Sequence, residues 1–172
     1  MLWPSIGTII FVVVVPGTVV VYVPFFLSDW HVAAPFFGLR AVRWLGVLLV
    51  GCALPVFTDF ILRFVREGRG TPAPVAPTRH LVMHGSFGYV RNPGYIAVVS
   101  LVLGQGLFFG STAVLLYGLG VSVAFHLFVV LYEEPTLRRQ FGEEYVAYCR
   151  DVPRWIPRRR RRPDGGARAS HL

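Results

Sequence analysis

Two adjacent glutamates, Glu133 and Glu134, are the residues of this sequence best suited to do chemistry. They directly follow an uncharged run, Ser111–Tyr132, and carboxylates at the end of a membrane-spanning segment are costly enough to indicate a function. The alternative is that the helix ends there and that both carboxylates are solvated. His126 lies seven residues before Glu133, so a helix places both side chains on one face. It is either a hydrogen-bonded interhelical residue or a contact for a substrate.

The stretch His84–Tyr95, H-G-S-F-G-Y-V-R-N-P-G-Y, contributes a second group of polar residues. Pro93 biases Asn92 away from the α region and suits the first turn of a helix, so the sequence predicts a shaped loop that opens onto a helix. Backbone N–H groups and a fixed arginine at a helix N-terminus form a natural seat for an anionic group. His80 and His84 have a spacing that can fit a metal, but no third ligand is evident, and we expect no metal site.

The motif Gly104-Gln105-Gly106 lies within the next apolar run. Small residues in membrane helices most often allow two helices to pack closely, which is one interpretation of this motif. The other is that the missing side chains leave room for a flat ligand against the backbone. In either case Gln105 is a buried polar group that needs a hydrogen-bonding partner.

The elements that must position these residues are membrane helices. With 54% hydrophobic residues and a mean hydropathy of +0.56 over 172 residues, the chain is too apolar for an ordinary soluble domain. A bilayer core requires roughly 20 mostly apolar residues per helix. Four segments are candidates, and the turn between the last two is so short that they must form an antiparallel hairpin. The predicted spans are Ile6–Leu27, Trp44–Leu62, Gly94–Gly110 and Ser111–Tyr132.

The chain becomes amphipathic after the last predicted span, and such a helix can lie at the membrane interface or cap the bundle. Four apolar or aromatic side chains fall on one helical face, opposite arginines and glutamates: Leu137, Phe141, Tyr145 and Tyr148. We therefore expect an all-α integral membrane protein, in which residues 1–157 form one domain with a four-span helical bundle and a cytoplasmic amphipathic C-terminal helix. The arginine-rich tail, residues 158–172, is expected to be disordered and to bind anionic lipid.

The net charge of +8 rests on arginine, because all 17 basic residues are arginines. A basic chain can bind nucleic acid, but in a membrane protein an excess of positive charge marks the cytoplasmic face. Five arginines lie between the second and third predicted spans and ten follow the fourth, against two between the first and second. This distribution places both termini in the cytoplasm. We expect a multi-pass protein of the bacterial inner membrane, with membrane lipids rather than nucleic acid as partners.

Four sequence motifs occur in an order and spacing that resembles the integral-membrane methyltransferases, which include the isoprenylcysteine carboxyl methyltransferases and the phospholipid N-methyltransferases. The motifs span Leu81–Pro157, and they are G-S-F-G-Y-V-R-N-P-G-Y, G-Q-G, E-E-P-T-L-R-R-Q-F-G-E-E-Y-V-A-Y and V-P-R-W-I-P. The resemblance implies S-adenosylmethionine as the cofactor, bound at the cytoplasmic ends of the last spans in a site closed by the C-terminal helix. One departure is Asn92, where many family members have histidine.

The resemblance also implies roles for individual residues. Those that match the cofactor-binding motifs are Tyr89, Arg91, Asn92, Pro93, Tyr95, Gly104, Gln105, Gly106, Glu133 and Glu134. Those that match the C-terminal element closing the site, where they would contact the substrate, are Tyr145, Tyr148 and Arg154. Methyl transfer is an in-line displacement, so positioning and desolvation do most of the work. A carboxylate acceptor needs no base, whereas an ammonium headgroup must first lose a proton, for which Glu134 and His126 are the candidate catalytic residues.

These features predict an enzyme that methylates a lipophilic acceptor, either an isoprenylcysteine-like carboxylate or a phospholipid-like amine. Membrane sterol reductases resemble the same C-terminal architecture but use NADPH. They should carry extra basic residues for the 2′-phosphate of that cofactor and usually have more spans. The third alternative is a non-catalytic membrane protein in which the motif residues only pack helices. It predicts no cofactor binding.

Overall fold

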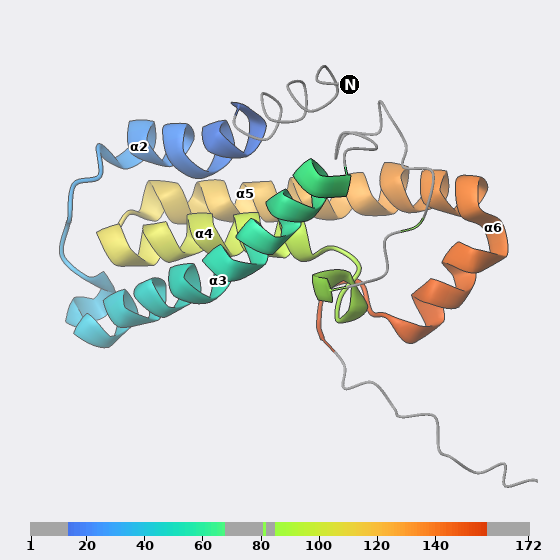
Figure 1. The fold of residues 1–172 in the computed structure, drawn as a ribbon. Helices are drawn as coiled ribbons and strands as arrows, with labels where there is room; N and C mark the ends of the chain where they lie inside the picture. The colour runs from blue at the N-terminus through green and yellow to red at the C-terminus, as the bar shows by residue number, and fades with distance from the viewer. Residues whose placement is uncertain (1–13, 68–80, 82–84, 158–172) are drawn as a thin grey trace, which may run out of the picture.

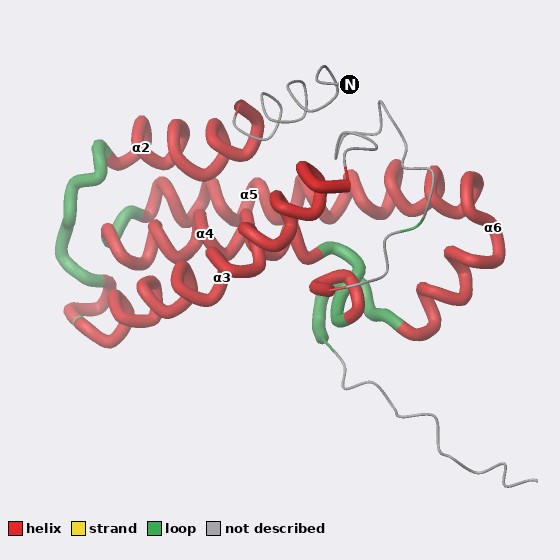
Figure 2. Tube along the Cα trace, in the orientation of Figure 1, coloured by secondary structure: helices red, strands yellow, loops and turns green. Residues whose placement is uncertain are grey.

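The computed structural model describes residues 14–67, 81 and 85–157, and all regular structure in this part of the chain is helical (Figure 1, Figure 2). The all-α fold class is confirmed for these residues. The predicted tail, His80 and His84 lie outside them. The elements are η1 (Thr18–Tyr22), α2 (Val23–Ser28), η2 (Phe36–Gly38), α3 (Arg40–Glu67), η3 (Gly85–Gly88), α4 (Pro93–Phe109), α5 (Thr112–Phe128), η4 (Val129–Glu133) and α6 (Glu134–Asp151).

Two helices of the described chain are long and apolar enough to cross a membrane. They are the stretch Arg40–Leu62 of α3 and the stretch Thr112–Asp151, which comprises α5, η4 and α6. Only 11% and 17% of the most apolar 18-residue stretches of these two helices are buried, whereas the core helix of a soluble protein is mostly buried. Their apolar side chains therefore face outward, as contact with lipid requires.

The four predicted spans correspond to helices in part. The segment Trp44–Leu62 lies within α3, and α4 agrees with Gly94–Gly110 to within one residue at each end. However, α4 and the helical stretch Val14–Ser28 are shorter apolar helices. The described residues therefore contain two helices of membrane-spanning length, and the four-span topology stays a prediction.

Helix α4 packs against both α3 and α5, and two glycines allow the close contact. A Cβ atom on Gly104 would lie 2.7 Å from Val50 Cγ2 of α3 and 2.9 Å from Gly46 O. A Cβ atom on Gly106 would lie 2.6 Å from Leu115 Cδ2 of α5. Real Cβ atoms do not approach other atoms so closely. Position 104 therefore needs glycine for the helices to pack, because Gly46 O is a backbone atom, whereas at Gly106 the nearest atoms belong to the Leu115 side chain.

Two polar side chains tie the N-terminal helical stretch to this bundle. Gln105 Nε2 donates hydrogen bonds to Val20 O at 2.8 Å and to Leu101 O at 3.2 Å. The Tyr117 hydroxyl of α5 donates to Val19 O at 3.2 Å. Val20 lies in the π-helical turn η1, and Leu101 lies in α4 itself. Gln105 therefore has the partner that a buried amide requires.

The connection between α4 and α5 is the tight hairpin that the sequence predicts. Gly110 ends α4 in the left-handed region at φ 70°, and a Cβ atom there would lie 2.5 Å from Ala34 O. Ser111 then caps α5, because its hydroxyl accepts a hydrogen bond from Val114 N at 3.3 Å. A glycine C-cap followed at once by a serine N-cap reverses the chain, and the two helices run antiparallel (Figure 1).

Helix α6 extends beyond the bundle and then turns back (Figure 1). The reversal occurs at Gly142, whose φ of 52° and ψ of −126° are outside the helical region. The sequence predicted one helical face from Leu137 to Tyr148, and the bend at Gly142 interrupts that helix. The residues after α6, which we name the C-terminal strap (Val152–Pro157), end beside the loop that precedes α4, where Arg91 N donates to Pro153 O at 2.9 Å.

Candidate active site

The two glutamates lie where the last long helix changes its hydrogen-bonding pattern. The π-helical turn η4 ends at Glu133, and α6 begins at Glu134. Successive residues of a helix point about 100° apart, so the two carboxylates face different neighbours. Glu133 Oε2 accepts a hydrogen bond from the Tyr95 hydroxyl of α4 at 2.9 Å. Glu134 faces the strap, where Arg154 donates from Nε to Oε1 at 2.6 Å and from Nη2 to Oε2 at 2.8 Å.

Arg91 is a second cation at Glu134. Its Nη1 lies 3.1 Å from Glu134 Oε1 and donates to Cys149 Sγ at 2.7 Å. Its Nε is buried and has no hydrogen-bonding partner in the described part of the chain. A buried N–H without an acceptor costs free energy, so this nitrogen is a donor that a ligand could satisfy. We use the name acid cluster for Glu133, Glu134, Tyr95, Arg91 and Arg154.

Asn92 and Pro93 hold the strap and start α4. Asn92 is 6% exposed, and its Nδ2 donates to Arg154 O at 3.3 Å. Pro93 is buried at the first turn of α4, where its fixed φ suits a helix start. The sequence prediction of a shaped loop opening onto a helix is confirmed, and the amide of Asn92 connects that loop to the strap.

Tyr145 and Tyr148 support the returning half of α6. Both are buried, and with Val152 they form a small hydrophobic core to which Leu137 and Phe141 also contribute. The Tyr148 hydroxyl donates to Phe87 O of η3 at 2.8 Å. The predicted apolar face of α6 therefore packs on the loop before α4, with Tyr145 and Tyr148 buried and Leu137 and Phe141 partly buried.

The charges of the acid cluster are unevenly compensated. Glu134 has two guanidinium partners, whereas Glu133 has the neutral Tyr95 hydroxyl and no cation among the described residues. Hydrogen bonding to Glu134 raises the pKa of Arg154 above its ordinary value, so this guanidinium stays charged. Glu133 is therefore the carboxylate of the cluster best placed to stabilise a positively charged ligand.

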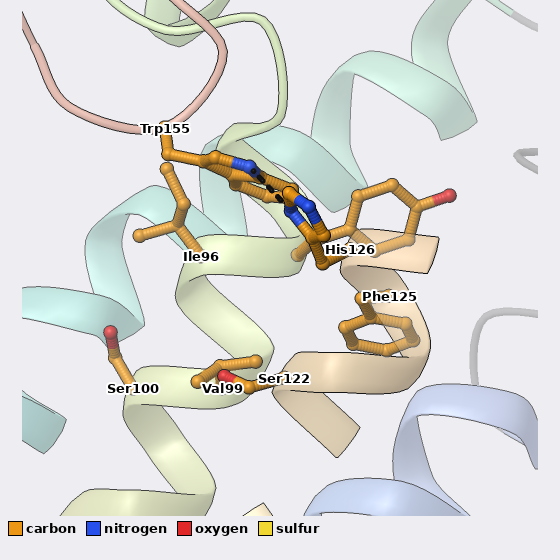
Figure 3. A pocket seen from close by; sticks show the side chains of 8 residues that line it. Ile96, Val99, Ser100, Ser122, Phe125, His126 and Trp155 are labelled. Atoms are coloured by element: carbon orange, nitrogen blue, oxygen red, sulfur yellow. Dashed lines mark hydrogen bonds between the residues drawn. The ribbon is translucent and has the colours of Figure 1, made fainter. Parts of the chain in front are cut away.

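A cavity of about 300 Å³ adjoins the acid cluster (Figure 3). Tyr95 belongs to both, because its hydroxyl binds Glu133 and its ring lies 4.7 Å from the Phe125 ring, centroid to centroid. Aromatic rings, aliphatic side chains and hydroxyls together suit a small amphiphilic ligand or a lipid headgroup. The lining residues are Tyr95, Ile96, Val99 and Ser100 of α4, Ser122, Phe125 and His126 of α5, and Trp155 of the strap.

Comparison with known proteins adds an independent finding. A family model described as phospholipid methyltransferase matches residues 41–144, which is more than half of the chain. This chain belongs to the phospholipid methyltransferase family. The resemblance seen in the sequence is confirmed, and the match reaches further toward the N-terminus than the motifs, since it includes most of α3. Among curated proteins, none matches the chain.

In this member of the phospholipid methyltransferase family, the structure brings together about half of the residues predicted to bind the cofactor. They meet at one end of the bundle, beside the strap, and they are Arg91, Asn92, Pro93, Tyr95, Glu133 and Glu134. Tyr89 belongs to the same loop, but its side chain is 68% exposed. Gly104, Gln105 and Gly106 are about 16 Å or more along α4 from Pro93, and the contacts described above are with neighbouring helices.

The structure also brings in residues that the sequence did not single out. Trp155 Nε1 donates to Nδ1 of the exposed His126 at 3.2 Å, and Cys149 accepts from Arg91. Trp155 directly follows Arg154 in the V-P-R-W-I-P motif, which is the one signal that pointed toward it. Its partner lies 29 positions earlier in the chain, and no local pattern reports such a contact. The serines of the cavity, Ser100 and Ser122, had no distinguishing pattern at all.

Proposed function

We propose that this family member transfers a methyl group from S-adenosylmethionine to the amine headgroup of a membrane lipid. The family match supports methyl transfer, and the contact between Glu133 and cavity-lining Tyr95 supports the position of the site. We also propose the four-span topology with both termini in the cytoplasm, which puts the acid cluster on the side where the water-soluble cofactor is made. In a bacterium the membrane would be the inner membrane.

The acid cluster suits this cofactor chemically. S-adenosylmethionine carries a carboxylate, and the buried Nε of Arg91 is a donor without an acceptor among the described residues. It also carries cationic groups, which a carboxylate such as that of Glu134 stabilises by charge-assisted hydrogen bonds. Arg91 and Glu134 would hold its polar groups. When bound, the cofactor supplies an electrophilic methyl group.

We assign Glu133 as the base that removes a proton from the ammonium group of the acceptor lipid. A primary ammonium must lose a proton before its nitrogen can act as a nucleophile. Glu133 Oε1 has no hydrogen bond to the described residues, and the bond from Tyr95 to Oε2 holds the carboxylate beside the cavity. Glu134, the candidate base from the sequence, is instead engaged on both oxygens by Arg154. The contacts thus favour Glu133 as base and Glu134 as an anchor.

The lining of the cavity favours an amine over a carboxylate. Faces of aromatic rings attract ammonium groups, and Tyr95, Phe125 and Trp155 all line the cavity. The uncompensated charge of Glu133 would add to this attraction, whereas it would repel a carboxylate acceptor. An isoprenylcysteine-like carboxylate is the second candidate acceptor, as the sequence resemblance allows.

Calorimetric titration of the detergent-solubilised protein tests the cofactor. We expect saturable binding of S-adenosylhomocysteine and no binding of NADPH. Binding of NADPH alone would indicate a reductase instead. Binding of neither ligand, by protein shown to be folded by circular dichroism, would indicate a non-catalytic role for the motif residues.

Transfer of a labelled methyl group to phosphatidylethanolamine vesicles tests the acceptor and the base. We expect Glu133→Gln to lower kcat by about 10²–10⁴-fold and to keep most of the affinity for S-adenosylhomocysteine. Glu134→Gln should weaken that affinity, and Glu143→Gln, at an exposed position of α6, is the matched control. Full activity of Glu133→Gln would exclude it as the base. Methylation of a prenylated cysteine but not of the vesicles would establish the carboxylate acceptor.

A further inference from the structure

The strap contributes one residue to the lining of the cavity. Seven of the eight lining residues come from α4 and α5, and Trp155 is the eighth. Its indole Nε1 donates to His126 Nδ1 at 3.2 Å, and the two ring centroids are 6.0 Å apart (Figure 3). The indole therefore closes part of a cavity that the two helices alone leave open.

The hydrogen bond places the indole at the end of the cavity nearest the acid cluster. Tyr95 lies in the first turn of α4 and His126 in the last turn of α5. Ser100 and Ser122 lie about one helical turn further from that end. Trp155 therefore lines the same cavity as Tyr95, whose hydroxyl holds Glu133.

Neighbouring contacts attach the part of the strap that carries the indole. Arg154, the preceding residue, binds Glu134 with two hydrogen bonds, and Pro153 O accepts from Arg91 N. Three consecutive strap residues are thus attached to three different parts of the fold. A side chain held in this way presents a wall of fixed position rather than a flexible cover.

We propose that Trp155 is a specificity-determining residue, whose indole limits the bulk of the group that can approach Glu133. The inference rests on the proposed function, because it takes the cavity as the acceptor site. An acceptor nitrogen gains bulk with each methyl group, so this wall discriminates between amines by their degree of methylation. His126 acts as a positioning residue, since its neutral Nδ1 accepts the indole N–H and orients the ring.

The activity test compares two lipids, dihexanoyl phosphatidylethanolamine and its N,N-dimethyl derivative. We expect Trp155→Ala to raise the ratio of kcat/KM for the dimethyl lipid over the unmethylated lipid by about tenfold or more. Trp155→Phe keeps most of the wall and should change the ratio by less than about threefold. His126→Leu should shift the ratio in the same direction as Trp155→Ala, and His126→Gln, which offers an acceptor oxygen, should restore it. Equal ratios in all of these variants would overturn the proposal.

Indole NMR provides a readout that needs no turnover. The chain has four tryptophans, so the labelled protein gives four indole N–H signals, and Trp155→Phe identifies the one from Trp155. Titration with the unmethylated lipid should shift the Trp155 signal more than the other three. A Trp155 signal that stays fixed while the lipid binds would overturn the proposal.

The comparison of the two lipids and the NMR titration together distinguish a failure of this proposal from a failure of the proposed function. Wild-type protein that does not bind S-adenosylhomocysteine, or that methylates neither lipid, counts against the proposed function. The NMR titration then still decides whether the indole contacts the headgroup. Loss of turnover with both lipids in Trp155→Ala, with S-adenosylhomocysteine still bound, would overturn the specificity role, because it would make Trp155 necessary for the reaction itself.

Discussion

Glu133 and Glu134 are neighbours in the chain but differ in their surroundings. Arg154 and Arg91 neutralise Glu134, while Glu133 has a tyrosine hydroxyl as its partner. Two carboxylates in different environments can take different roles, one as a fixed anchor and one as a proton acceptor. The anchor, Glu134, matters as much as the proton acceptor, Glu133, because the Glu134–Arg154 pair attaches the strap that completes the cavity.

Arg154→Ala tests this anchor. Loss of two charge-assisted hydrogen bonds should lower the free energy of unfolding by about 2–3 kcal/mol. Arg154→Lys should recover only part of this, because an ammonium cannot reproduce the two-pronged contact with a carboxylate. Thermal unfolding of the detergent-solubilised variants measures the effect, with Arg138→Ala at an exposed position of α6 as the control. Equal stability of Arg154→Ala and Arg138→Ala would show that the pair contributes nothing measurable.

Two irregular turns in the last helix give the site its shape. The π-helical turn η4 widens the helix up to and including Glu133, and Gly142 reverses α6 after both glutamates. π-Helical turns often occur at functional positions, because they re-aim side chains without ending the helix. Without the bend at Gly142, α6 would continue away from the bundle and the strap would not reach α4.

The glycines of α4 allow a test that separates packing from ligand binding. Gly104→Ala should destabilise the protein by about 1–3 kcal/mol, because its Cβ would lie 2.9 Å from Gly46 O, a backbone atom that cannot turn away. Gly51→Ala is the matched control, since a Cβ atom there meets nothing within 4 Å. Unfolding temperatures and S-adenosylhomocysteine affinity measure the two effects. Weaker binding with unchanged stability in Gly104→Ala would instead support the cofactor-binding interpretation of this glycine.

The two ends of the bundle differ in chemistry. One end carries the acid cluster and the strap. At the other end Arg43 donates to Phe108 O and Ala33 O, and the Trp30 and Phe109 rings stack with centroids 6.5 Å apart. Between the ends, α3 and α5 expose apolar side chains. An apolar belt between two polar ends is the distribution that a bilayer imposes.

Cysteine labelling tests the proposed orientation. In a background with both native cysteines replaced by serine, His31→Cys and Asp151→Cys each place one thiol at an exposed position. A membrane-impermeant maleimide should label His31→Cys in intact cells and Asp151→Cys only after the membrane is permeabilised. The reverse pattern would place the acid cluster on the outer side and contradict the arginine distribution.

The α-helical class, the bounds of α4 and the hairpin were predictable because they depend on local properties. Apolar length decides which segments can be helices in lipid, and the glycine and serine at 110 and 111 decide where the chain turns. The residues of the acid cluster were also identified from their motifs. Their partners were not, because neighbouring helical residues point about 100° apart and the sequence does not say which neighbour each one faces.

Only the tertiary structure decided the remaining features. Gly104 and Gly106 had two interpretations, and the close approach of α3 and α5 accounts for both residues by packing. Gly142 lay within a helical pattern, and its bend became evident only in the folded chain. The contact between Trp155 and His126 joins residues from different elements. Periodicity along a chain reports which face of a helix is apolar, whereas contacts between elements depend on how those faces meet in space.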